Sequence, residues 1–217
     1  MKRTTFIVLC ILAISCHRQV QQPNMNTPLL SKYFTENDRK ELVKIVAFTD
    51  SLVMAGTSAT DMNEAYHTYF DSVRQLYASG SNKNHSFNEP EKQTFLFGLD
   101  STFFHKIWIK STPRIIHPQD TVLYNLENFF SVSVNWNGGY MKYLKEKGEE
   151  NEYFKKIFES IEVAGDIPPT IFGDFLQNHR QFDFKDAENR LWAAIFILRM
   201  TDPMDLQLKR YFENQKS

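Results

Sequence analysis

The feature that most constrains this chain is an uninterrupted apolar run close to its C-terminal end. Residues 191–198 read Leu-Trp-Ala-Ala-Ile-Phe-Ile-Leu, with no polar side chain among the eight. A helix without a polar face has to be buried on every side, and crossing a membrane takes about 20 apolar residues. The run therefore predicts the central helix of a bundle, with Ile195 and Leu198 almost fully buried.

Apolar residues recur at helical spacing through most of the remaining chain. Thr35 and Asp38 are placed to cap one helix, and Gly56 to end it. Another helix is predicted from a Thr60 cap to Gly80. Four further helices are expected. One begins at Asn88 and runs across residues 95–103, one ends at Gly148, one ends at Gly165, and one begins at Pro168 and Pro169.

The stretch around residues 130–136 has a different periodicity. Apolar and polar residues alternate there as Phe-Ser-Val-Ser-Val-Asn-Trp, which is typical of a strand. The expected fold is therefore all-α, a single domain over residues 29–217 with about six or seven helices. A short strand or extended segment is expected near residues 130–136.

The composition suits a packed core and excludes several classes of function. Phenylalanine is abundant at 19 residues, against 8 glycines and 8 prolines, as expected for packed helices. The 25 basic and 26 acidic residues nearly cancel and form no basic stripe, so the electrostatic footprint of nucleic-acid binding is missing. The short motifs of phosphate loops, zinc proteases and serine hydrolases are missing as well. No cofactor is predicted.

The first residues have the order of an export signal. Lys2 and Arg3 precede an apolar stretch, and Ser15 stands directly before Cys16. Positive charge, a short apolar core and a small residue make up a signal peptide. The boundary Leu-Ala-Ile-Ser-Cys resembles the lipobox of bacterial lipoproteins, although Ala13 stands where that motif most often has leucine.

This resemblance implies a lipid-anchored protein. Residues 1–15 would be removed as the signal peptide, Cys16 would be acylated, and residues 16–28 would form a flexible tether. The resemblance also implies a place in the bacterial cell envelope, at the outer membrane or facing the periplasm. The membrane, reached through the lipid on Cys16, is thus one expected partner.

Cysteine usage agrees with this expectation. The two cysteines are Cys10, inside the expected signal peptide, and Cys16. The folded part would then contain no thiol, which excludes thiol catalysis, thiolate zinc sites and disulfides from it. The domain would have to be held together by its core.

No group of titratable residues has the spacing of a catalytic or metal site. His67 shares a predicted solvated helix face with Glu64 and Asp71, and these three residues would at most hold a cation weakly. Asp183 and Asp186 stand just before the apolar run, where carboxylates cap a helix. Glu146 belongs to a stretch of mixed charges typical of a solvated surface. We therefore predict no catalytic residue and no metal ligand.

The most unusual segment is Asn-Trp-Asn-Gly-Gly-Tyr at residues 135–140. A tryptophan and a tyrosine beside a Gly-Gly turn can form an aromatic shelf for a ligand, since glycine allows close approach. The alternative is a turn that leads into a helix and whose aromatic residues belong to the core. Trp136 and Tyr140 are the binding residues we predict, with that alternative left open.

Three functions are compatible with the sequence. The first is a non-enzymatic protein-binding module, held at the membrane by Cys16, whose partner lies in the envelope. The second is an envelope hydrolase that acts on peptidoglycan or another glycan through dispersed Asp, Glu and His residues. The third is a binder of a small apolar ligand in the phenylalanine-rich interior. The absence of a catalytic motif favours the first.

Overall fold

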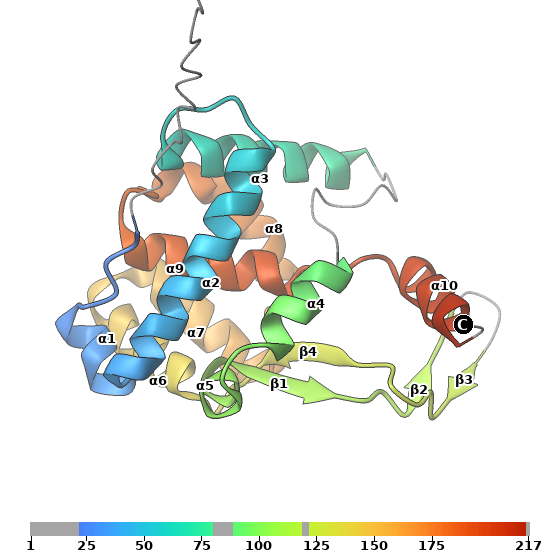
Figure 1. The fold of residues 1–217 in the computed structure, drawn as a ribbon. Coiled ribbons are helices and arrows are strands. Elements are labelled where there is room, and N and C mark those ends of the chain that lie inside the picture. Colours follow the sequence, from blue (N-terminus) through green and yellow to red (C-terminus); the bar gives the residue numbers. More distant parts are fainter. Residues whose placement is uncertain (1–21, 80–88, 119–121, 216–217) are drawn as a thin grey trace, which may run out of the picture.

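The computed structural model describes residues 22–79, 89–118 and 122–215. Within these ranges the chain forms ten α-helices and four short strands (Figure 1). The helices are α1 (Pro28–Tyr33), α2 (Glu36–Ala55), α3 (Met62–Ala78), α4 (Glu89–Phe97), α5 (Ser101–Ile107), α6 (Gly139–Glu150), α7 (Glu152–Ala164), α8 (Pro169–Asn178), α9 (Ala187–Arg199) and α10 (Met204–Asn214). The strands are β1 (Trp108–Ser111), β2 (Ile115–Ile116), β3 (Leu123–Tyr124) and β4 (Ser131–Val134). No helix in these ranges is long and apolar enough to cross a membrane.

The mostly helical architecture is confirmed, but the expected number of six or seven helices is too low. The helix predicted across residues 95–103 is divided into α4 and α5, because Asp100 caps a new helix by accepting from the N–H of Phe103 at 2.9 Å. The short helices α1 and α10 were not predicted. Each buries a single residue, Leu30 and Leu208 respectively, so neither has a broad apolar stripe.

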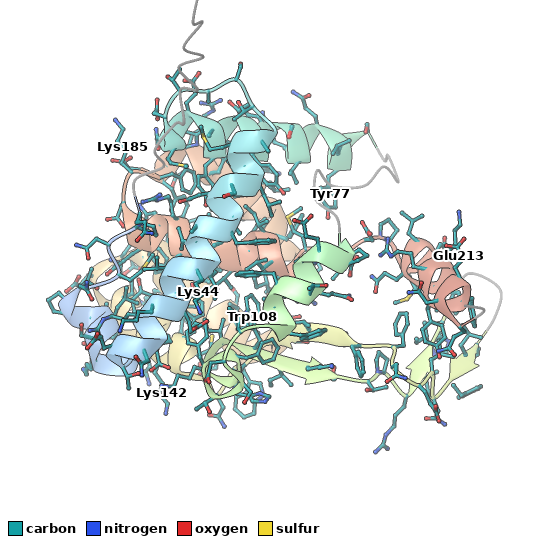
Figure 2. The ribbon with its side chains drawn as sticks, in the orientation of Figure 1. Lys44, Tyr77, Trp108, Lys142, Lys185 and Glu213 are labelled. Atoms are coloured by element: carbon teal, nitrogen blue, oxygen red, sulfur yellow. The ribbon has the colours of Figure 1, made fainter. Side chains whose placement is uncertain are left out.

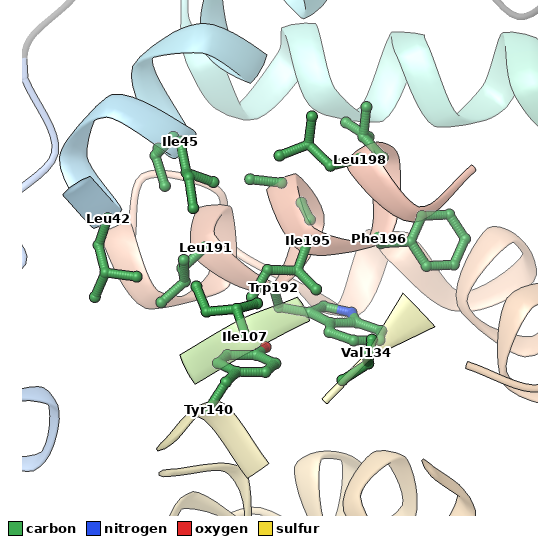
Figure 3. Packing of buried hydrophobic residues seen from close by; sticks show 14 of the residues in the cluster. Leu42, Ile45, Ile107, Val134, Tyr140, Leu191, Trp192, Ile195, Phe196 and Leu198 are labelled. Carbon is green, nitrogen blue, oxygen red and sulfur yellow. The ribbon is translucent and has the colours of Figure 1, made fainter. Parts of the chain in front are cut away.

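Helix α9 lies at the centre of the core, as the apolar run predicted. Each of its residues from Leu191 to Leu198 is at most 1 % exposed. Figure 3 shows Leu42 and Ile45 of α2 on one side of this helix, and on the other side side chains from α5, β4 and α6 (Ile107, Val134 and Tyr140). The core is thus built from segments that are far apart in sequence.

Side-chain caps and glycines that are close in sequence to a helix mark several of the helix ends. The Thr35 side chain accepts from the N–H of Asp38, and Asp38 accepts from the N–H of Thr35 in return, which is a capping box. Gly165 ends α7 with a φ of 76°, a conformation that favours glycine. The cap of α3 is Asp61 rather than the predicted Thr60.

Gly148 was predicted to end a helix, but α6 continues through it to Glu150. A Cβ atom at Gly148 would lie 2.8 Å from the Cα of Lys155 in α7. The glycine therefore allows the backbones of α6 and α7 to approach closely. Its role is in packing and not in helix termination.

The folded domain begins earlier than the sequence indicated. Residues 16–28 were expected to form a flexible tether, yet Met25 is 1 % exposed and belongs to the main core. The Thr27 hydroxyl donates to Glu188 of α9 at 2.6 Å. Residues 22–28 are therefore part of the domain, and residues 16–21 lie outside the described residues.

Two small antiparallel sheets are present: β1 pairs with β4, which we call the arm, and β2 pairs with β3. The predicted strand is present as β4, which pairs with β1 in the register Trp108 to Val134 and Ser111 to Ser131. Beyond this arm, β2 pairs with β3, and a second small core of Ile116, Phe129 and Leu208 joins them to α10. We call β2, β3, residues 125–130 and α10 the distal lobe, which lies to the right in Figure 1.

Candidate functional site

The outer face of the small sheet in the distal lobe is apolar and exposed. β2 and β3 pair Ile115 with Tyr124 and Ile116 with Leu123. Successive side chains of a strand point to opposite faces, and Ile116, 4 % exposed, belongs to the same small core as Leu208 of α10. The other pair points away from that core, with Ile115 51 % and Tyr124 63 % exposed. We call this surface the Ile115–Tyr124 face.

An apolar outer face is unusual for a two-stranded sheet. Antiparallel sheets with one packed face ordinarily carry polar residues on the other, whereas both faces are apolar here. Val122, directly before β3, adds a third exposed apolar side chain. The N–H of Asn125 donates to the carbonyl of Arg114 at 3.0 Å and extends the pairing. Backbone hydrogen bonds thus hold the Ile115–Tyr124 face in place.

A buried ionic cluster joins the distal lobe to the bundle. Figure 2 draws the side chains of both parts, with Glu213 of α10 labelled in the distal lobe. The Glu89 carboxylate accepts from the N–H of Asp202 at 2.7 Å and from Arg210 of α10 at 3.2 Å. Arg210 also pairs with Asp202 at 2.6 Å. The Lys92 ammonium donates to the carbonyl of Met200, and burial lowers the pKa of Lys92 from 10.5 to about 8. These contacts connect α10 to α4 and to the end of α9.

The two predicted binding residues lie in different environments. Trp136, in the turn before α6, is 54 % exposed. Tyr140, in α6, is fully buried and stacks on Tyr143 with 5.7 Å between the ring centroids. Tyr140 therefore belongs to the core, as the alternative interpretation expected. Of the two rings, Trp136 alone is accessible to a ligand.

The carboxylates singled out by the sequence have structural partners. Asp186 caps α9 by accepting from two backbone N–H groups at 2.7 and 3.2 Å, as predicted. Asp183 accepts from a backbone N–H at 2.9 Å. Glu146 accepts from the Tyr33 hydroxyl at 2.5 Å and pairs with Lys32, and the hydrogen bond from Lys32 lowers the pKa of Glu146.

Two histidines that are far apart in the sequence meet in the core. His67 Nδ1 in α3 lies 3.0 Å from His179 Nδ1, directly after α8. His179 Nε2 lies 3.3 Å from Asp71 Oδ1. His67 is 9 % exposed, so the prediction that it lies on a solvated helix face is wrong. No periodicity could have shown this contact, because 112 residues separate the two histidines.

When both histidines are neutral, the hydrogen bonds among Asp71, His179 and His67 allow only one arrangement of protons. The Asp71 carboxylate only accepts, so His179 carries its proton on Nε2 and accepts at Nδ1. His67 then donates from Nδ1, and its Nε2 is the basic end of the line. Burial lowers the pKa of both histidines, which favours this neutral state. Within the described ranges no group of three or more His, Cys, Asp or Glu side chains is placed to hold a metal ion.

Cys16, the predicted lipidation site, lies outside the described residues. No protein-family model matches the chain, and no curated protein or solved structure is significantly similar to it. Two features bear on the choice between a binding module and a hydrolase, the exposed Ile115–Tyr124 face and the line of Asp71, His179 and His67.

Proposed function

We propose that this chain is a lipoprotein of the bacterial cell envelope whose folded domain binds another protein and is not an enzyme. The observation that supports the binding role is the Ile115–Tyr124 face, an apolar surface on a sheet whose opposite face is already packed. The anchor on Cys16 is proposed from the sequence motif alone.

The free energy falls when a partner covers exposed apolar side chains. Complete burial of one large apolar side chain contributes about 1.5–3 kcal/mol relative to exposure, and Ile115 and Tyr124 both retain at least half of their exposure. Tyrosine is also among the side chains that contribute most to protein interfaces. A partner of matching chemistry has an apolar helix or strand with a polar rim.

The position of the distal lobe suits a membrane-anchored binding module. In Figure 1 the first described residues lie at the upper left of the molecule and the distal lobe lies at the right. Residues 16–21 would span at most about 20 Å when fully extended. A lipid on Cys16 would therefore hold the left side near the membrane and leave the Ile115–Tyr124 face accessible to a partner in the envelope.

The proposal is tested by the size of the complexes that the chain forms after extraction in mild detergent. The wild type should sediment as a complex, and the double variant Ile115→Thr, Tyr124→Thr should sediment as a single chain. Threonine suits a strand, so the sheet should be retained. The matched control is Val163→Thr in α7, at an apolar side chain that is 90 % exposed, and it should leave the complex intact.

Two outcomes contradict the proposal: a wild type that sediments as a single chain, or a complex that the double variant retains. A complex that the purified chain forms with itself would identify the partner as a second copy. Trp136→Ala, tested in parallel, shows whether the exposed ring at the other end of the arm belongs to the same interface.

A hydrolase remains the second candidate, and one observation favours it. A carboxylate behind an imidazole is the arrangement that orients a general base, and Asp71, His179 and His67 form such a line. Against it, His67 is only 9 % exposed, which leaves little room for a substrate at Nε2. Digestion of peptidoglycan by the purified chain, lost in His67→Gln at an unchanged melting temperature, would overturn the non-enzymatic proposal.

A further inference from the structure

A partly open cavity lies between the bundle and the distal lobe, bounded by α4, α10 and residues 128–132. It has two adjoining chambers of about 170 and 200 Å³. Their walls share five residues, Glu89, Gln93, Phe129, Phe130 and Gln207. Since a cavity of about 150 Å³ can hold benzene, each chamber is large enough for one six-membered ring.

Aromatic rings form one side of the smaller chamber. Phe129, Phe130 and Tyr211 line it, and Phe129 meets Tyr211 edge to face at 5.6 Å between centroids. The face of an aromatic ring carries partial negative charge and attracts C–H groups that carry partial positive charge. A ligand with a C–H-rich face is therefore well matched to this wall.

Amide side chains provide the polar part of the same chamber. Gln93, Asn128 and Gln207 all line it. Gln207 donates from Nε2 to the carbonyl of Asp202 at 2.6 Å, which leaves its Oε1 as an acceptor. Asn128 makes no side-chain hydrogen bond to any other described residue. Each amide offers both a donor and an acceptor, as a hydroxyl group does.

The charges around the cavity balance one another. Arg210 pairs with both Glu89 and Asp202, and Arg199, which lines the larger chamber, pairs with Asp166. The Lys92 ammonium donates to the carbonyl of Met200. The three carboxylates Glu89, Asp166 and Asp202 therefore balance the three cations Lys92, Arg199 and Arg210. A ligand with a net charge would disturb this balance, so a neutral ligand fits best.

We propose that this cavity binds a neutral saccharide of one or two pyranose rings. The amides match the hydroxyl groups of the sugar, and the aromatic wall matches its C–H face. A purely apolar ligand, the third function that the sequence left open, would bury these amides without partners, which is unfavourable. The site is separate from the Ile115–Tyr124 face and does not depend on the partner proposed there.

Calorimetric titration of the full chain in detergent tests this inference. The probes are neutral disaccharides built from glucose, mannose, galactose or N-acetylglucosamine, and at least one should bind saturably at up to millimolar concentration. Asn128→Gly should weaken that binding at least tenfold, because it removes an amide while glycine keeps the backbone φ of 60°. Asn125→Gly is the matched control: Asn125 has a φ of 51° in the same loop but does not line the cavity. Its variant should bind like the wild type.

A second substitution keeps the test independent of the loop. Gln93→Met in α4 preserves side-chain length and helix propensity and should also weaken binding. The inference is overturned if none of the disaccharides binds saturably, or if Asn128→Gly and Gln93→Met both bind as tightly as the wild type. Melting temperatures of all variants separate a lost contact from a lost fold.

Discussion

His67 Nδ1 lies 3.0 Å from His179 Nδ1, and the contact is a hydrogen bond only when one of the two nitrogens carries a proton. A first added proton can bind to His67 Nε2 without breaking the hydrogen bonds that join Asp71, His179 and His67. A second would have to go to His179 Nδ1, where it would face the N–H of His67. Acid should therefore separate α3 from the segment after α8.

This contact predicts a loss of stability on mild acidification. Burial holds the pKa of both histidines below 6.5 in the folded chain, whereas the unfolded chain keeps a value of about 6.5. Because the unfolded chain then binds more protons, the free energy of unfolding should fall as the pH decreases from about 6.5 through the lower folded values. Urea unfolding at a series of pH values measures this slope.

The variant His179→Gln should reduce that pH dependence. The control is His105→Gln, at an exposed histidine in α5, which should retain the wild-type slope. A wild type whose unfolding free energy stays constant between about pH 7 and pH 5, or equal slopes in both variants, would contradict the assignment.

The central position of α9 predicts a large cost for shortening its side chains. Leu198 is 1 % exposed and belongs to the main core. Leu198→Ala should lower the free energy of unfolding by about 2–5 kcal/mol, as other large-to-small core substitutions do. Chemical denaturation measures this change in the free energy of unfolding. A decrease well below that range would mean that the side chains around α9 collapse to fill the cavity left by Leu198.

Two helical glycines should respond oppositely to alanine. At Gly148 a Cβ atom would lie 2.8 Å from the backbone of Lys155, so Gly148→Ala should destabilise the domain by forcing α6 and α7 apart. At Gly173 in α8 nothing lies within 4 Å of the added atom, and Gly173→Ala should stabilise by about 0.5–1 kcal/mol through helix propensity. Thermal melts of both variants test the pair, and equal shifts would contradict the close approach of α6 and α7.

The fold was predictable where a signal is local. The run at residues 191–198 has no polar face, which determines its burial. The capping box at Thr35 and Asp38 and the stop at Gly165 each depend on residues close in sequence. The strand at β4 followed from alternation, but its partner β1 did not, because its four residues do not alternate.

Contacts between residues far apart in the sequence, including those of the candidate sites, could not be predicted from a local pattern. Asp50 and Arg190 form a buried ion pair at 2.8 Å across 140 residues of sequence, and the histidine contact is of the same kind. The Ile115–Tyr124 face was missed because four apolar residues on two very short strands do not show which of them α10 will cover. Trp136 could be singled out because an aromatic residue beside two glycines is a local signal, and its role in binding stays a prediction.

The anchor predicts a simple biochemical result. Cys16 is the only cysteine that would remain after removal of residues 1–15. Fatty-acid labelling of the chain in a bacterial host should therefore be lost in Cys16→Ser, and the domain should be released in soluble form. Labelling of Cys16→Ser at the wild-type level would exclude the lipoprotein assignment.

The most direct test of the protein-binding role is site-specific photo-crosslinking in intact cells. A photoreactive amino acid replaces Tyr124 in one variant and Val163 in the other. Val163 is exposed on α7, which is not part of the distal lobe. The account predicts one discrete protein adduct at position 124, abolished by Ile115→Thr, and no adduct at position 163. An absence of adducts at 124, or the same adducts at both positions, would contradict a binding surface at the Ile115–Tyr124 face.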